Sequence, residues 1–261
     1  MTTDGTRGAG AFSQATGRVP GEEAGADKPR YRQFQHDLIV EHCGRSVLEV
    51  GAGLGEFAET LTGLDRLVVT DVDPDAVAVM RQRFAGRPEV AVRQLDVERG
   101  LQLDEPVDTV VTINVLEHIE DDAETVRSLA RLVVPDGNIV AWVPAYEQLY
   151  GDFDRKVGHV RRYTPASLTA TFEAAGLRPT HVRPVNVLGG LAWWAAVRRG
   201  GTGAPDPRLV AVYDRVVVPL TRVLERVVSI PFGQSILGVA EVPRSVAVPV
   251  DPPVAGEKSA G

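Results

Sequence analysis

The chain has 261 residues, and its 35 acidic and 28 basic residues give a formal net charge of −7. Because the basic residues are scattered or paired and form no stripe along a phosphate backbone, we expect no nucleic-acid partner. The single cysteine, Cys43, excludes an intrachain disulfide and a cysteine-based metal cluster, and it is typical of a cytoplasmic protein.

The composition predicts one folded domain between two tails. Residues 1–28 are rich in Gly, Ala, Thr and Glu without apolar periodicity, which predicts a disordered leader, and the proline-containing stretch 243–261 predicts a disordered tail. Residues 29–242 are enough for one domain with its own core. The longest apolar run, 187–197, is far shorter than the ~20 residues that span a bilayer, so we expect no integral membrane contact.

The first half of the domain alternates between helical and extended patterns. We expect helices at 31–43, 56–61, 74–84 and 121–132, and strands at 46–50, 67–70, 90–92, 107–113 and 138–143. Asp73 before Pro74 is a good helix cap. This alternation predicts an α/β fold with a parallel sheet covered on both faces.

The second half has a different pattern. We expect a helix at 164–176, a strand at 181–187 and a last strand at 235–242. Between the strands, 209–228 reads as one long amphipathic helix that Pro219 bends. Its apolar face, which suits either the core or a homodimer interface, contains Leu209, Tyr213, Val216, Leu220, Val223 and Val227.

A glycine-rich turn follows the first strand, with Gly51, Gly53 and Gly55 at alternate positions. Such a turn lets the backbone approach a ligand at the carboxyl end of the sheet. A dinucleotide-binding turn would have its third glycine where Glu56 stands. Glu49, two residues before the turn, would repel a pyrophosphate but suits a cationic ligand. S-adenosylmethionine is therefore favoured over NAD, although an NAD-dependent oxidoreductase stays an alternative.

A second acid, Asp71, ends the second strand, 20 residues after Gly51. A carboxylate there can accept both hydrogen bonds of a ribose diol. The neighbouring Asp73 is better explained as the helix cap. The alternative is that Glu49 and Asp71 are simply solvated acids at strand ends.

Together with the segments 94–97, 112–119 and 133–138, these residues resemble the class I S-adenosylmethionine-dependent methyltransferases. The resemblance implies a Rossmann-like, doubly wound sheet of seven strands with the last strand antiparallel, and C-terminal helical additions. Residues 46–145 would form the cofactor half and 146–242 the acceptor half. The implied cofactor contacts are Glu49, Gly51, Ala52, Gly53, Asp71, Val72, Asp96, Val97, Asn114, Val115 and Leu116.

The segment 150–164 is similar to a subgroup of bacterial methyltransferases found with glycan or natural-product biosynthesis. The resemblance implies a small-molecule acceptor, a natural product or a sugar, methylated on oxygen or nitrogen. Tyr150, Arg162 and Tyr163 in this segment are our candidate acceptor contacts, with Tyr31 on the first helix, which relatives place over the cofactor.

Methyl transfer to a hydroxyl or an ammonium group also requires that a proton be removed, and two histidines are our candidate bases. His118 follows the fourth strand, where it could instead brace the loop under the cofactor. His159 lies among charged residues that could instead form a salt-bridged loop. We expect no metal site in the acidic run 117–124, because acids at a helix start are favoured by the helix dipole.

Three alternatives remain open from the sequence. A protein of this fold could bind the cofactor as a scaffold without turnover. The apolar segment 187–197 and the amphipathic helix allow peripheral membrane contact and a lipid-linked acceptor. Trp193 and Trp194 could belong to the core, to an acceptor pocket or to such a membrane-facing surface.

Overall fold

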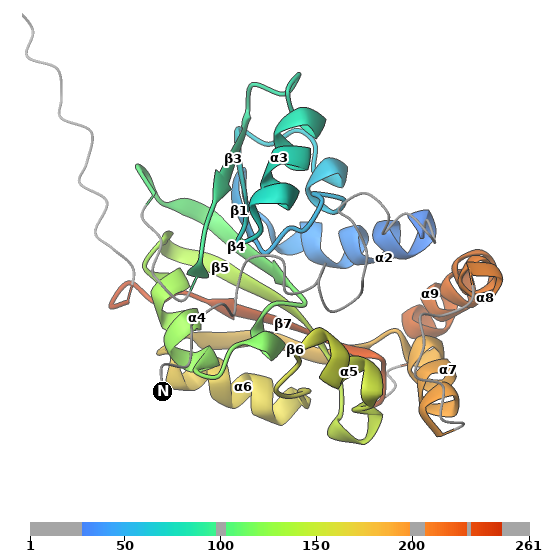
Figure 1. Cartoon of the computed structure of the whole chain (residues 1–261). Coiled ribbons are helices and arrows are strands. Elements are labelled where there is room, and N and C mark those ends of the chain that lie inside the picture. The colour runs from blue at the N-terminus through green and yellow to red at the C-terminus, as the bar shows by residue number, and fades with distance from the viewer. Residues whose placement is uncertain (1–27, 98–102, 199–206, 229–230, 247–261) are drawn as a thin grey trace, which may run out of the picture.

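The computed structural model describes residues 28–97, 103–198, 207–228 and 231–246. Seven strands form one sheet in the order β3-β2-β1-β4-β5-β7-β6 (Figure 1). β7 runs antiparallel to both of its neighbours, and the pairings among the first five strands are parallel. The predicted fold class is confirmed. The strands are β1 (Ser46–Val50), β2 (Arg66–Asp71), β3 (Val90–Gln94), β4 (Val107–Ile113), β5 (Val133–Pro144), β6 (Arg178–Val185) and β7 (Ser235–Glu241).

The register of the central strands brings three loops to one edge of the sheet. Val50, the last residue of β1, pairs with Thr70 on one side and with Thr112 on the other. Gly51, which follows β1, therefore lies between Asp71 at the end of β2 and Ile113 at the end of β4, which Asn114 follows. The carboxyl ends of parallel strands are where ligands bind in such folds.

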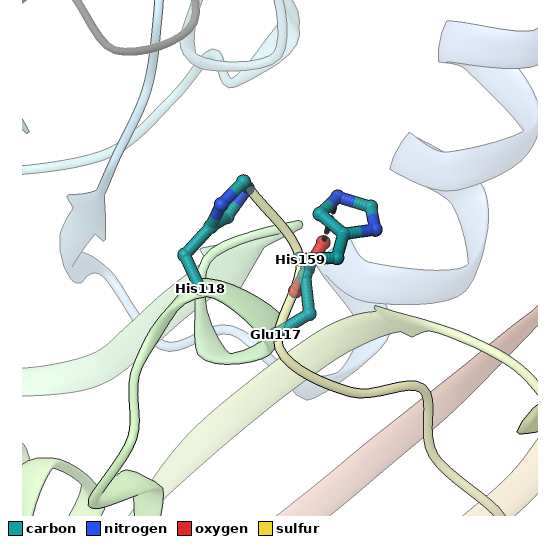
Figure 2. Close-up of side chains that lie close together, drawn as sticks. All are labelled: Glu117, His118 and His159. Carbon is teal, nitrogen blue, oxygen red and sulfur yellow. Dashed lines mark ion pairs between the residues drawn. The ribbon is translucent and has the colours of Figure 1, made fainter. Parts of the chain in front are cut away.

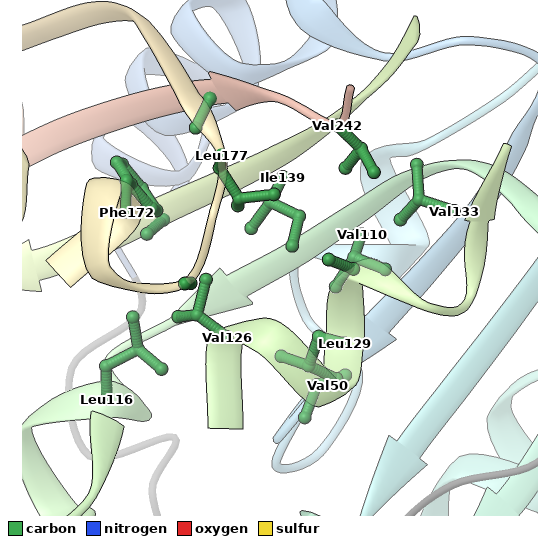
Figure 3. Packing of buried hydrophobic residues seen from close by; sticks show 14 of the residues in the cluster. Val50, Val110, Leu116, Val126, Leu129, Val133, Ile139, Phe172, Leu177 and Val242 are labelled. Carbon is green, nitrogen blue, oxygen red and sulfur yellow. The ribbon is translucent and has the colours of Figure 1, made fainter. Parts of the chain in front are cut away.

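One face of the sheet is covered by α4 (Asp122–Ala130) and α6 (Pro165–Ala174). Their apolar side chains, among them Val126 and Phe172, pack with strand residues such as Ile139 into the core cluster shown in Figure 3. Phe172 lies close to Gly238 of β7, where a Cβ atom would come within 2.8 Å of its ring. The close approach of α6 to the sheet therefore requires a glycine at this position.

The other face carries two helices and two short 3₁₀ turns: α2 (Pro29–Ile39), η2 (Val40–His42), η3 (Ala58–Thr60) and α3 (Pro74–Arg83). Phe34 and Met80 are buried against strand residues here. The side chain of Asp73 accepts a hydrogen bond from the backbone N–H of Asp75 at 2.9 Å, so the predicted cap is confirmed. The helix predicted at 56–61 is wrong, because the chain is still turning through the glycine loop and leaves room for only one 3₁₀ turn.

The C-terminal additions are α7 (Val187–Arg198), α8 (Pro207–Val212), the π-helical turn η7 (Tyr213–Val217) and α9 (Val218–Val227). They gather at one end of the molecule, beside α2 (Figure 1). The π turn ends just before Pro219, which has no N–H and could not complete a regular helical bond. The segment 209–228 is therefore interrupted by a π turn, and the bend at Pro219 stays a prediction.

The first helix depends on these additions for its N-terminal cap. Lys28, the N-cap residue of α2, makes no side-chain cap hydrogen bond. Instead the buried carboxylate of Asp214 accepts from the backbone N–H groups of Tyr31 at 2.9 Å and Arg30 at 3.3 Å. A residue of the π turn thus caps a helix 183 positions earlier in the chain.

The apolar face predicted on 209–228 is not buried in the core. Four of its residues and the neighbouring Val212 form what we call the exposed apolar stripe, with each side chain between 52% and 79% exposed: Val212, Val216, Leu220, Val223 and Val227. The segment instead contacts the domain through Tyr213, through the buried Val218 and through the ion pair of Arg222 with Asp37. The sequence left open whether this face meets the core or a second subunit, because an amphipathic pattern does not say what it contacts.

Two short segments complete the description. The 3₁₀ turn η6 (Glu147–Leu149) leads into α5 (Asp152–Val157), a helix that the sequence analysis did not predict. The 3₁₀ turn η5 (Leu116–His118) follows β4. The predicted leader and tail fall outside the described residues, apart from Lys28 and a turn at 243–246. Among the described helices, none combines the length and the apolar character needed to cross a membrane.

Candidate active site

The glycine turn after β1 has the geometry of a ligand cradle. Gly51 and Gly53 have φ values of 70° and 56°, in the left-handed region that favours glycine. A Cβ atom on Gly51 would lie 2.5 Å from Val115 Cγ2, whereas one on Gly53 would meet no atom within 4 Å. Val115 therefore packs directly under the turn, and open space lies beside Gly53.

Asp71 ties this turn to the second strand. Its Oδ2 accepts from the Gly53 N–H at 2.7 Å and its Oδ1 from the Asp73 N–H at 2.9 Å. Burial raises the pKa of Asp71, and these backbone hydrogen bonds oppose the increase. Carboxylate oxygens have further lone pairs for a ribose diol, so ribose binding would come in addition to a structural role that the sequence did not reveal.

Glu49 is a buried acid that forms no ion pair with a described residue. It is 2% exposed, and its Oε2 has no hydrogen-bond partner among the described residues. Burial, followed by the nearby Asp71, raises the pKa of Glu49 to about 8. A buried carboxyl group with an unsatisfied oxygen is costly unless a ligand completes it, and a cationic ligand would complete both its charge and its hydrogen bonding.

The other candidate cofactor residues border the same edge. Val72 accepts a hydrogen bond from the Gln94 side chain, and Asp96 and Val97 follow the end of β3. Asn114 is exposed with φ of 53°, so it turns the chain sharply after β4. Leu116 is fully buried in the core, with its backbone carbonyl occupied by the Tyr163 hydroxyl. Ala52 is half-buried in the turn.

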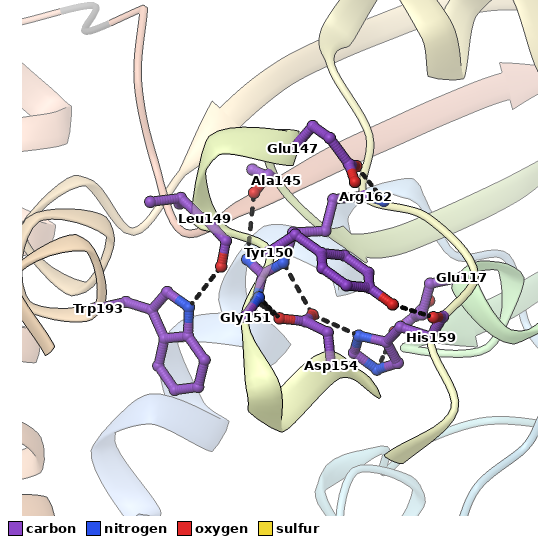
Figure 4. A network of polar contacts seen from close by, with 10 residues as sticks. All are labelled: Glu117, Ala145, Glu147, Leu149, Tyr150, Gly151, Asp154, His159, Arg162 and Trp193. Carbon is purple, nitrogen blue, oxygen red and sulfur yellow. Dashed lines mark hydrogen bonds and ion pairs between the residues drawn. The ribbon is translucent and has the colours of Figure 1, made fainter. Parts of the chain in front are cut away.

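A polar network around Asp154 lies next to this edge (Figure 4). Asp154 is fully buried, and it receives Arg162 Nε and Nη2 at 2.8 and 3.0 Å, the Gly151 N–H at 2.8 Å and His159 Nδ1 at 2.7 Å. Burial opposes its ionisation, but the hydrogen bonds from His159 and Arg162 hold the pKa of Asp154 below its usual value. An ionised carboxylate only accepts, so Nδ1 of His159 must donate and the neutral ring has its lone pair on Nε2.

Glu117 and His118 come from η5 and meet His159 from the loop after α5 (Figure 2). Glu117 is fully buried, and neither carboxylate oxygen has a hydrogen-bond partner among the described residues. His159 Nε2 lies 3.8 Å from Glu117 Oε1, and the two histidine rings are 4.7 Å apart. Burial raises the pKa of Glu117 to about 8, whereas desolvation and then His159 lower the pKa of His118 to about 4.

Comparison with known proteins adds the family. A family model described as a methyltransferase domain matches residues 23–182. The chain belongs to this methyltransferase family. A protein of Mycolicibacterium smegmatis named "Probable S-adenosylmethionine-dependent methyltransferase" is 30% identical over 182 residues, which are 66% of this chain and 67% of that protein.

Two further similarities extend over different shares of the chain. A ubiquinone biosynthesis O-methyltransferase of Alkalilimnicola ehrlichii is 39% identical over 103 residues, which are 37% of this chain but only 40% of that protein. The solved structure of the N-methyltransferase NodS of Bradyrhizobium japonicum with S-adenosyl-L-homocysteine has a TM-score of 0.57 at 16% identity, covering 90% of this chain and 99% of that one. At this low identity, the similarity to NodS shows the fold alone.

This methyltransferase uses S-adenosylmethionine, and the glycine-turn residues fit that cofactor. The unsatisfied Glu49 carboxyl group and the open space beside Gly53 are the two observations that carry the fit. When bound, the cofactor supplies an activated methyl group on a positively charged sulfur. The family assignment thus favours the methyltransferase over the dinucleotide oxidoreductase that the sequence left open.

Three of the predicted acceptor contacts have their polar groups occupied within the methyltransferase. Arg162 is buried on Asp154, and the Tyr150 hydroxyl donates to the His159 carbonyl at 2.7 Å. Tyr163 is 1% exposed, and its hydroxyl donates to Asp122 at 2.7 Å. These hydrogen bonds tie the three side chains to Asp122, His159 and Asp154, and their contact with the acceptor stays a prediction. Tyr31 packs at 6.3 Å against Trp142 under α2.

An apolar wall that was not predicted from the sequence lies beside His159. The Phe153 ring lies 6.4 Å from the His159 ring and 5.4 Å from the Trp193 ring. Trp193 donates to the Leu149 carbonyl at 3.0 Å, and the Arg162 guanidinium lies 5.6 Å from its ring. The two tryptophans therefore differ, since Trp193 joins the site and Trp194 is 41% exposed.

Proposed function

We propose that this methyltransferase methylates a hydroxyl oxygen of a small-molecule acceptor that binds against Glu117, His118 and His159. The observation that carries the proposal is the Asp154–His159 pair, which holds an imidazole with a free Nε2 lone pair beside Phe153 and Trp193. The similarity to a ubiquinone biosynthesis O-methyltransferase supports oxygen as the methylated atom.

A hydroxyl acceptor has to lose its proton as its oxygen bonds to carbon. Nε2 of His159 would receive that proton, and Asp154 would orient the ring and stabilise the imidazolium that results. The Phe153 and Trp193 rings would hold an apolar part of the acceptor and exclude water from its reacting oxygen. Glu49 and Asp71 would hold the ammonium group and the ribose of the cofactor.

The direct test follows the methyl group itself. The protein is incubated with cofactor carrying a ¹³C methyl group and with fractionated small-molecule extracts of bacterial cells, and the labelled product is analysed by NMR. We expect the label in the chemical-shift range of an O-methyl group. A label found only on nitrogen or carbon would contradict the proposal. Tight cofactor binding without transfer to any fraction would favour the scaffold alternative.

The exposed apolar stripe supports a variant in which the acceptor is lipid-linked. Five apolar side chains along α8, η7 and α9 face outward, and exposed arginines at 208, 215 and 226 flank them. An apolar helical face bordered by cations is typical of helices that lie in an anionic lipid interface. We propose that this stripe docks on such a surface.

We expect the protein to float with phosphatidylcholine vesicles that contain phosphatidylglycerol, and less with pure phosphatidylcholine. Val223→Glu, at the centre of the stripe, should release most of the bound protein, because it places a charge in the interface. Val40→Glu is the matched control, since Val40 is also exposed but lies outside the stripe. The protein could instead stay unbound to vesicles and sediment as a dimer that Val223→Glu disrupts. That result would identify the stripe as a subunit interface.

A further inference from the structure

We propose that Glu117, His118 and His159 form a binding site for a divalent transition-metal ion. One ligand atom from each residue lies within 4.8 Å of the other two. The three residues come from two segments that meet beside the acceptor side, and the backbone N–H of Val160 donates to the Glu117 carbonyl at 2.8 Å, which fixes one segment on the other.

The first argument is the surroundings of His159. Metal-binding histidines almost always donate their second ring N–H to a carboxylate or a carbonyl, which fixes the tautomer and orients the lone pair toward the ion. His159 Nδ1 has such a partner in Asp154 at 2.7 Å, and Arg162 and Gly151 hold Asp154 in turn. The Nε2 lone pair is thus directed to the side of Glu117 (Figures 2 and 4).

The second argument is the carboxyl group of Glu117. It is fully buried, yet neither oxygen has a hydrogen-bond partner among the described residues. Buried polar atoms are nearly always paired, and exceptions mark functional sites or ions that are not shown. An ion held by both histidines would supply the missing partner. A network of hydrogen bonds within the protein would not explain two unsatisfied oxygens.

The donor set selects the kind of ion. Two imidazole nitrogens and one carboxylate oxygen suit Zn²⁺ and similar first-row ions, and His₂Glu sites keep a further coordination position open. Ligand atoms ~2.0–2.2 Å from zinc stand about 3.4 Å apart in a tetrahedral site. Side-chain rotations that draw the three atoms together would therefore complete the site, and the exposed ring of His118 leaves an entry from solvent.

This inference deepens the proposed function, and it rests on that function only for the role of the ion. The open position would hold the acceptor hydroxyl, and coordination would favour its ionised form, with the proton released to solvent. His159 would then act as a ligand, whereas the proton transfer to Nε2 described above belongs to the metal-free protein. The metal measurement below uses neither cofactor nor acceptor, so its outcome is independent of methyl transfer.

The test measures Zn²⁺ binding to the full chain after chelator treatment, by equilibrium dialysis and metal analysis. We expect one ion per chain in the wild type. His118→Gln and Glu117→Gln should each weaken binding at least tenfold, and Asp154→Asn, which removes the carboxylate that orients His159 and pairs with Arg162, about 10–100-fold. Co²⁺ substitution should give the absorption of a low-coordinate site with nitrogen and oxygen ligands, and His118→Gln should remove it.

A second histidine pair provides the matched control. His42 and His181 have rings 5.7 Å apart beside Glu41, at a different place in the fold. His181→Gln should leave Zn²⁺ binding unchanged. The proposal is overturned if folded wild-type protein binds no Zn²⁺, or if binding persists in His118→Gln and Glu117→Gln. His118 is exposed, so its variant should fold normally, and unchanged circular dichroism would confirm this.

Discussion

Replacement of His159 by alanine should lower kcat for methyl transfer by about 10²–10⁴-fold, the usual contribution of a positioned acid–base group. The expected loss applies whether Nε2 receives the proton or binds an ion, because both roles use the same lone pair. The KM for S-adenosylmethionine should stay unchanged, since the hydrogen bonds, ion pairs and ring contacts of His159 join it to Asp154, Glu117, His118 and Phe153 and not to the glycine turn. Steady-state kinetics with cofactor and acceptor varied separately would measure both effects.

The matched control for this experiment is His181→Ala, an exposed histidine on β6 that belongs to no part of the site. Its kcat should equal that of the wild type. Asp154→Asn should give an intermediate loss, because the ring stays in place but its orienting carboxylate is gone. A His159→Ala enzyme with undiminished kcat, and with an intact circular dichroism spectrum, would remove this residue from the mechanism.

Replacement of Glu49 by glutamine should weaken S-adenosylmethionine binding by about 10–100-fold. The substitution keeps the volume but removes the charge, and a hydrogen bond to a charged group contributes about 1.5–3 kcal/mol. Calorimetric titration would give the dissociation constant. Glu59→Gln is the control, because Glu59 is an exposed acid on η3 whose partner is Arg83. Equal affinities of wild type and Glu49→Gln would show that Glu49 does not contact the cofactor.

The same residue gives cofactor binding a defined pH dependence. Glu49 has a pKa of about 8 before binding, so it is mostly protonated at pH 7. A cationic ligand favours the ionised form and lowers this pKa, so binding should release a proton. Affinity should be greatest above pH 8 and fall as the pH drops below it. Titrations in buffers of different ionisation enthalpy would count the proton, which should be absent in Glu49→Gln.

Much of the fold was predictable because the central strands have clear sequence signals. The apolar run at 107–113 matches β4 at both ends, and the first strand ends where the glycines begin. The helix α5 was missed because its six residues contain one aromatic and four charged side chains, too short a stretch to show periodicity. What the exposed apolar stripe contacts was left open by the sequence, because periodicity reports amphipathicity, whereas burial depends on what the rest of the chain provides.

The cofactor-binding edge of the sheet was predictable from the sequence, whereas the arrangement of the acceptor side was not. Glu49, Gly51 and Asp71 occupy fixed positions at the ends of adjacent parallel strands, so sequence spacing alone brings them together. Glu117 and His159 are 42 positions apart and meet through loops, where spacing gives no geometry. A metal site was not expected in the acidic run 117–124, because sequence spacing does not reveal that one of those acids is buried beside two histidines.

The cap that Asp214 places on α2 has a consequence for the order of folding. The helix leaves the ribosome early, but the carboxylate that satisfies its first N–H groups follows 183 residues later. At about 5–20 residues per second, translation of that interval takes roughly 10–40 seconds. During this time the amino end of α2 has only water as a partner, and the apolar surface that α2 covers, including Phe34, stays without its final packing. A nascent chain of this enzyme should therefore stay open to chaperones and proteases until its last helices have been synthesised.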